Sequence, residues 1–139
     1  MSTGDRSYDS ARLIYAPLSG YPPFRIELLK VAGEVEGFIS LLQHQLSPLP
    51  ENPSQITISL LTENGVIEER GDLFEGKMKV RLPQTLLSEL ILSLKNGKNV
   101  TISLDGFQSE LQADEFQKSF PPFEKGESLA WLHIRNPYE

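Results

Sequence analysis

The segment Asn-Val-Thr-Ile-Ser-Leu-Asp-Gly-Phe-Gln-Ser-Glu-Leu, residues 99–111, indicates the type of fold expected for this chain. Its central Asp105-Gly106 is typical of a two-residue turn between antiparallel strands, because both residues tolerate positive φ. The expected pairs are Leu104 with Phe107, Ile102 with Ser109, and Val100 with Leu111. Paired residues share a face of the sheet. The apolar residues match across the pair, so the segment predicts a hairpin with one buried face.

An amphipathic helix is expected directly before this hairpin, over residues 84–95. Its apolar residues repeat at helical spacing and form one wide stripe. The stripe consists of Leu86, Leu87, Leu90, Ile91 and Leu94. Asn96-Gly97 then supplies a residue that easily adopts the left-handed conformation, which ends a helix. Such a helix would cover an open end or an edge of a sheet.

Further strands are indicated by alternating apolar and polar residues. They are expected at Phe24–Val31, Gln55–Thr62, Val66–Arg70, Leu73–Leu82 and Leu129–Ile134. Asn64-Gly65 and Ala32-Gly33 are typical of tight turns between strands. The segment 35–46 has apolar residues at helical spacing, but Gly37 interrupts them, and a buried strand is favoured over a helix there. A short helix at 113–120 is expected to end at Pro121-Pro122.

The predicted fold class is mainly β (α+β): an antiparallel β-sandwich or partly open barrel of about seven strands, with helix 84–95 between strands. The chain has 139 residues, which suits one domain. A single β-rich domain is expected over residues 15–139, after a flexible segment at 1–14. A net charge of −6 disfavours nucleic-acid binding, because phosphate is negative.

Few catalytic arrangements are available to this sequence. It has no cysteine, which excludes disulfides, thiol catalysis and cysteine-ligated metals. Its two histidines, His44 and His133, are far apart in sequence and give no spacing argument for a metal site. Glu68 and Glu69 adjoin a hairpin and are interpreted as a solvated face. We therefore expect no enzyme activity, no cofactor and no metal site.

Two groups of side chains are candidates for binding a partner protein. Lys77, Lys79 and Arg81 repeat at a spacing of two and would share one strand face, as an anionic-ligand or partner stripe or simply as the solvent face of a sheet. No aromatic residues interleave with them in the sequence, so a nucleic-acid platform is not expected. The second group consists of aromatic residues in proline-rich segments, namely Tyr21, Phe120 and Phe123. Their rings would form a recognition surface or, the more common case, plug the ends of the core.

The segment Val80–Phe120 runs from a strand through Leu-Pro, an apolar helix that ends in Leu94-Lys95-Asn96-Gly97-Lys98, and a Val-Thr-Ile-Ser-Leu strand. This order resembles the C-terminal half of the invasion-associated locus B proteins, which are β-sandwich proteins of Gram-negative envelopes. The resemblance implies a β-sandwich with an envelope location. The cysteines typical of that family are absent from this chain.

The leading hypothesis is a non-enzymatic β-sandwich or barrel that binds a protein partner, in a bacterial envelope if a signal peptide has been removed and in the cytoplasm otherwise. The alternative is a small acidic secretion-chaperone-like or adaptor protein, in which an exposed 86–94 stripe would form a dimer seam. The sequence leaves the oligomeric state open. It contains no stretch of the roughly 18–20 apolar residues that a transmembrane helix requires.

Overall fold

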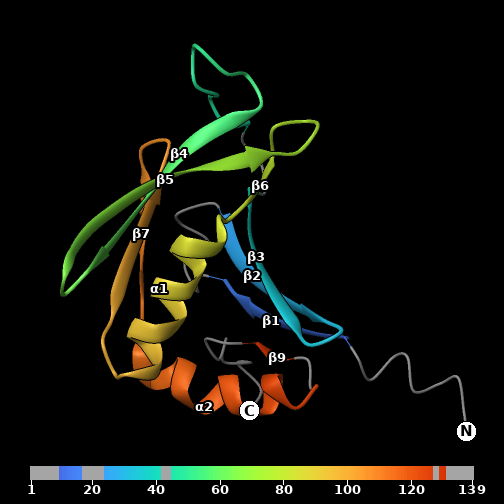
Figure 1. Cartoon of the computed structure of the whole chain (residues 1–139), viewed down its shortest axis with the longest axis vertical. Helices are drawn as coiled ribbons and strands as arrows, with labels where there is room; N and C mark the ends of the chain where they lie inside the picture. Colours follow the sequence, from blue (N-terminus) through green and yellow to red (C-terminus); the bar gives the residue numbers. More distant parts are fainter. Residues whose placement is uncertain (1–9, 17–23, 42–44, 127–128, 131–139) are drawn as a thin grey trace, which may run out of the picture.

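The computed structural model describes residues 10–16, 24–41, 45–126 and 129–130. In these residues, one sheet curls into a half-barrel; of the two helices, the first lies within the curl and the second lies across one end of it (Figure 1). The strands are β1 (Ser10–Tyr15), β2 (Phe24–Val31), β3 (Glu34–Leu41), β4 (Gln55–Thr62), β5 (Gly65–Leu73), β6 (Lys79–Arg81), β7 (Val100–Leu104), β8 (Phe107–Leu111) and β9 (Leu129–Ala130). The helices are α1 (Gln84–Lys95) and α2 (Ala113–Glu124).

The strands of the sheet follow the order β8-β7-β4-β5-β6-β3-β2-β1-β9. Neighbours are antiparallel throughout except for β1 and β9, which are parallel. The three-residue strand β6 joins a meander of β1, β2 and β3 to a second group of β4, β5, β7 and β8. The prediction of a mainly β, partly open barrel is confirmed, with nine strands in the described residues where about seven were expected.

The core lies between the concave face of the sheet and the two helices. Alternate residues of β4 and β7 are buried and point toward α1, as period-two patterns require. The predicted apolar stripe of α1 is also buried, with Leu86, Leu90 and Leu94 at 0% exposure. Phe116 and Phe123 of α2 are likewise fully buried. The helices therefore complete the core that the open half-barrel would otherwise expose.

A tyrosine joins the two far parts of the curled sheet. The Tyr15 hydroxyl on β1 lies 3.1 Å from the Ser109 hydroxyl on β8 and donates a hydrogen bond of 3.3 Å to the Glu110 carbonyl. Tyr15 and Ser109 are each 6% exposed. Because β1 and β8 stand near opposite ends of the strand order, these contacts hold the half-barrel in its curled form.

Two glycines flank β6 on the concave face. A Cβ on Gly37 of β3 would lie 2.9 Å from methyl carbons of both Leu82 and Leu87. A Cβ on Gly71 of β5 would lie 2.5 Å from the backbone oxygen of Arg81. The absence of side chains at these two positions lets the chain turn sharply from β6 into α1.

The structure confirms several predictions that rest on local sequence. The register of the β7–β8 hairpin is the predicted one, and α1 has the predicted bounds of residues 84–95. The segment that begins at Val35 is a strand up to Leu41, as favoured, and Ala32-Gly33 is a turn with φ of 53° and 84°. Of the predicted strand at 129–134, residues 129–130 form β9 and the rest lies outside the described residues.

Four predictions need correction. The tight turn between β4 and β5 lies at Glu63 and Asn64, one residue before the predicted Asn64-Gly65, because Thr62 pairs with Gly65. Leu73–Leu82 is not one strand, because the chain turns at residues 74–78, where Gly76 and Lys77 adopt φ of 92° and 59°. The helix α2 continues through Pro121-Pro122 to Glu124, since burial of Phe123 stabilises its last turn. Residues 10–14, expected in a flexible segment, belong to β1, where they pair with β2.

Candidate functional site

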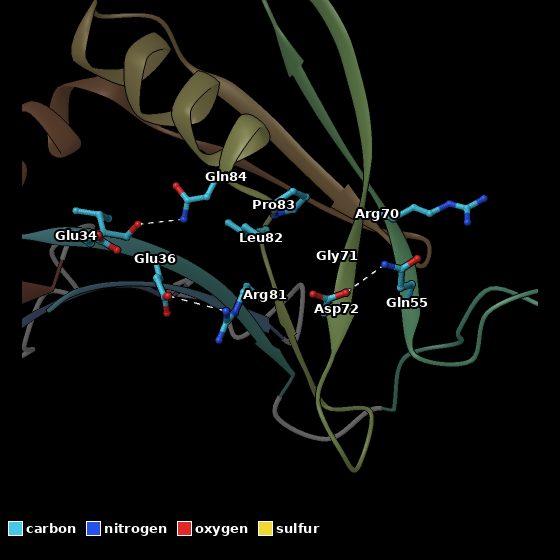
Figure 2. A pocket seen from close by; sticks show the side chains of 11 residues that line it. Glu34, Glu36, Gln55, Arg70, Gly71, Asp72, Arg81, Leu82, Pro83 and Gln84 are labelled. Carbon is cyan, nitrogen blue, oxygen red and sulfur yellow. Dashed lines mark hydrogen bonds and ion pairs between the residues drawn. The ribbon is translucent and has the colours of Figure 1, made fainter.

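The sheet splits where β6 ends, and a cleft opens there. Arg81 pairs with Phe38 of β3 on one side and with Asp72 of β5 on the other. After Arg81 the chain leaves the sheet for α1, so β3 and β5 diverge with no described strand between them (Figure 2). The resulting cleft has a volume of about 650 Å³.

Charged and amide side chains line most of the cleft. The lining residues come from β3, β4, β5 and β6 and from the start of α1, and they are Glu34, Val35, Glu36, Gln55, Arg70, Gly71, Asp72, Arg81, Leu82, Pro83 and Gln84. Three contacts hold the polar groups in place (Figure 2). The Arg81 guanidinium lies 3.9 Å from the Glu36 carboxylate, Gln55 donates to Asp72 at 3.1 Å, and Gln84 donates to the Val35 carbonyl at 3.3 Å.

Arg70 contributes little positive charge to the cleft. Its guanidinium points away from the cleft (Figure 2) and donates to the Glu51 carboxylate at 2.9 Å. Arg81 is already paired with Glu36. Glu34 has no ion-pair partner in the described part of the chain. The cleft therefore has an excess of negative charge at its β3 side.

A cluster of cations and aromatic rings lies beside the cleft on the convex face of the sheet. The Lys79 ammonium is 4.6 Å from the centre of the Phe38 ring and 5.2 Å from that of Phe74. The Arg81 guanidinium is 5.6 Å from the Phe38 ring, and the two rings meet edge to face at 5.8 Å. Phe38 is 6% exposed under these cations, whereas Phe74 is 37% exposed.

This cluster corrects the expectation that no aromatic residues accompany the cationic stripe. Phe38 is contributed by β3, which is distant in sequence and adjacent only through pairing. Phe74 was expected on the opposite face of a continuous strand, but the turn at 74–78 brings it to the face of Lys79. Lys77 lies in that turn, so only Lys79 and Arg81 of the three predicted cations share the strand.

The two aromatic candidates that the structure describes do not form an exposed recognition surface. Phe120 and Phe123 are 3% and 0% exposed and lie in the core, where Phe120 stacks on Phe116 at 4.6 Å. They plug the end of the half-barrel, the more common of the two alternatives. Tyr21 lies outside the described residues, as do His44 and His133.

The structure also removes the basis for two other hypotheses, a catalytic carboxylate pair and a dimer seam. Glu68 and Glu69 are successive residues of β5, so their carboxylates point to opposite faces of the sheet and do not form a pair. The stripe at 86–94 is covered by the molecule's own sheet, and four of its leucines are at most 2% exposed. It is therefore not available as a dimer seam.

The described residues contain no group of three or more histidine, aspartate or glutamate side chains placed to hold a metal ion. In that part of the chain, no helix has the length and apolar character needed to cross a membrane. No family model, no curated protein and no solved structure matches this chain.

Proposed function

We propose that this chain is a non-catalytic binding domain that holds a segment of a partner protein in the cleft between β3 and β5. The observation that carries the proposal is the split of the sheet at Arg81, which places a cleft of about 650 Å³ between two strands. Charged and amide groups from separate elements converge on that cleft. Such groups fix the orientation of a bound segment through hydrogen bonds.

The surface beside the cleft favours a protein partner over a small molecule. Small-molecule sites are mainly apolar and enclosed, whereas this cleft is polar and open to solvent. Phe74, which lies near Arg81, is 37% exposed, and Met78 in the same turn is 38% exposed. Aromatic residues and methionine are enriched at the centres of protein interfaces. Arg81 contacts both the cleft and the aromatic rings and so connects the two parts of the surface.

The proposal is tested by selecting binders from a displayed library of random twelve-residue peptides. Gln84→Trp would fill the cleft from α1. Gln117→Trp is the matched control, because both glutamines are exposed, both lie on helices, and each donates to a backbone carbonyl, at 3.3 Å and 2.9 Å. Selected peptides are expected to bind the Gln117 variant as they bind the parent chain, and to bind the Gln84 variant at least tenfold more weakly. Equal binding to both variants, or a library that yields no binder, contradicts the proposal.

A further inference from the structure

We infer that the open edge of β5, from Val66 to Arg70, binds a lysine- or arginine-bearing extended segment of the partner as an added strand. The inference rests on the proposed function and extends the binding surface from the cleft, which Arg70 lines, along the neighbouring edge of β5. Three features of the described residues carry it: the direction of the β5 backbone groups, the state of the opposite edge, and the charge along the edge of β5.

The hydrogen bonds at the end of β5 show which way its backbone groups point. The Leu73 amide donates to the Ser54 carbonyl on the β4 side at 2.8 Å, and the Phe74 amide donates to the Lys79 carbonyl on the β6 side at 2.8 Å. Backbone groups of successive strand residues alternate between the two sides. The amides and carbonyls of Val66, Glu68 and Arg70 therefore point to the side of β6.

These groups face no described strand. β6 pairs only with Asp72 and Leu73 of β5, and beyond Arg81 the chain belongs to α1. The open stretch from Val66 to Arg70 is about 17 Å long at the usual rise of a strand. A row of unpaired amides and carbonyls of this length is a template for an additional strand.

The opposite edge of the cleft is already partly occupied. On β3, the Gly37 carbonyl accepts a hydrogen bond of 2.8 Å from the Leu82 amide, and the Val35 carbonyl accepts one from the Gln84 side chain. An incoming segment thus finds more free backbone groups on β5 than on β3. The bound segment would lie between β5 and β3, in line with β6 and beyond its end at Arg81.

The charge along the open edge selects basic segments. Glu68 and Glu69 on β5 and Glu34 across the cleft form no ion pair within the described part of the chain, while Arg70 is paired with Glu51. Opposite charges directly across two strands stabilise pairing, and like charges oppose it. Lysine or arginine in the incoming segment would meet Glu68 on the convex face or Glu69 on the concave face.

A second copy of this chain fits the edge poorly in the two registers that use the whole of the open stretch. Twofold symmetry requires antiparallel pairing of β5 with its own copy. Pairing centred on Glu68 sets this carboxylate opposite itself. Moving the centre to Glu69 sets Val66 opposite Asp72, where β6 already occupies the edge.

The probe for this inference is a synthetic seven-residue peptide with blocked ends that alternates threonine and lysine, compared with a peptide in which glutamate replaces each lysine. Fluorescence anisotropy at low salt measures binding, and amide exchange followed by NMR measures the bonding pattern. The lysine peptide is expected to bind at least tenfold more tightly. On binding, exchange of the Val66, Glu68 and Arg70 amides is expected to slow at least tenfold, while Ile67 and Glu69, already bonded to β4, change little.

A protein variant tests the same backbone groups. Glu68→Pro removes an edge amide and the Glu68 carboxylate but none of the bonds to β4, and proline is tolerated where the amide faces solvent. Glu68→Gln removes the charge and keeps the amide, so the difference between these two variants measures the contribution of the backbone group. Gln108→Pro, on the outer side of β8, is the control for a proline on an exposed strand. Glu68→Pro is expected to bind the peptide at least tenfold more weakly than Glu68→Gln does, and Gln108→Pro is expected to change binding less than twofold.

The outcomes separate the two proposals. If library peptides bind in a Gln84-dependent way but the alternating exchange pattern is absent, the added strand is refuted and the binding domain stands. If the lysine peptide does not bind, or binds no better than the glutamate peptide, the inference is refuted. If no peptide binds at the cleft, both proposals fail.

Discussion

Replacing Tyr15 by phenylalanine is expected to loosen the closure of the half-barrel. The change removes one hydroxyl and leaves the ring, so packing in the core is preserved. It deletes the contact with the Ser109 hydroxyl and the bond to the Glu110 carbonyl. Because Tyr15 and Ser109 are each 6% exposed, water does not easily replace these partners.

The expected loss in the free energy of unfolding is about 2 kcal/mol, since each net hydrogen bond contributes roughly 1 kcal/mol and buried groups left unpaired cost about 1–3 kcal/mol. With an unfolding entropy of about 2.1 cal/mol/K per residue, 139 residues give roughly 0.3 kcal/mol/K. The melting temperature should therefore fall by about 7 °C. Urea unfolding and thermal denaturation by circular dichroism measure the two quantities.

A double-mutant cycle with Ser109→Ala isolates the contact itself. A coupling energy of about 1 kcal/mol is expected between the two changes, because they remove the same hydrogen bond. Ser59→Ala, which removes an exposed hydroxyl that donates to Glu68 at 3.3 Å, is the control and should change stability by less than about 0.5 kcal/mol. Fully additive effects of the Tyr15 and Ser109 changes would refute a closure through these hydroxyls.

Three further changes probe the core and the convex face, each measured by urea unfolding. Gly71→Ala should destabilise by about 1–3 kcal/mol, because its Cβ would lie 2.5 Å from the Arg81 carbonyl; no loss would mean that β6 can move away. Leu90→Ala should cost about 2–5 kcal/mol, since Leu90 is fully buried, and a smaller loss would contradict its place in the core. Arg12→Met should cost about 1 kcal/mol by leaving Glu27 without its partner at 2.7 Å, and less at high salt; a salt-independent loss would exclude an electrostatic cause.

Local sequence signals predicted the elements whose structure is decided within a few residues. The β7–β8 hairpin follows from Asp105-Gly106 and matching apolar residues, and α1 from its stripe and Asn96-Gly97. The turn at 74–78 was missed although Gly76 was visible, because the apolar residues Phe74, Met78, Val80 and Leu82 keep an even spacing across it. A period-two pattern does not distinguish one long strand from two paired ones.

The candidate site depends on contacts that no local pattern contains. The cleft exists because β6 ends at Arg81 between two strands that come from different parts of the chain. Phe38 reaches Lys79 only through the pairing of β3 with β6. The spacing of Lys79 and Arg81 in the sequence identified them as candidates. Their aromatic neighbours and the open edge of β5 could be found only once the strand order was known.

The pairing of β1 with β9 and the contact of Tyr15 with Ser109 also bear on the order of events in folding. The two hydroxyl-bearing residues are separated by 94 positions, and Leu13 pairs with Leu129. During synthesis the meander of β1, β2 and β3 emerges long before these partners exist. Pairings so distant in sequence form slowly, after local hairpins and helices. While synthesis is incomplete, β1 lacks both β9 along its outer edge and the contact of Tyr15 with β8. The outer edge is paired only after Leu129–Ala130, the last described residues, have been made.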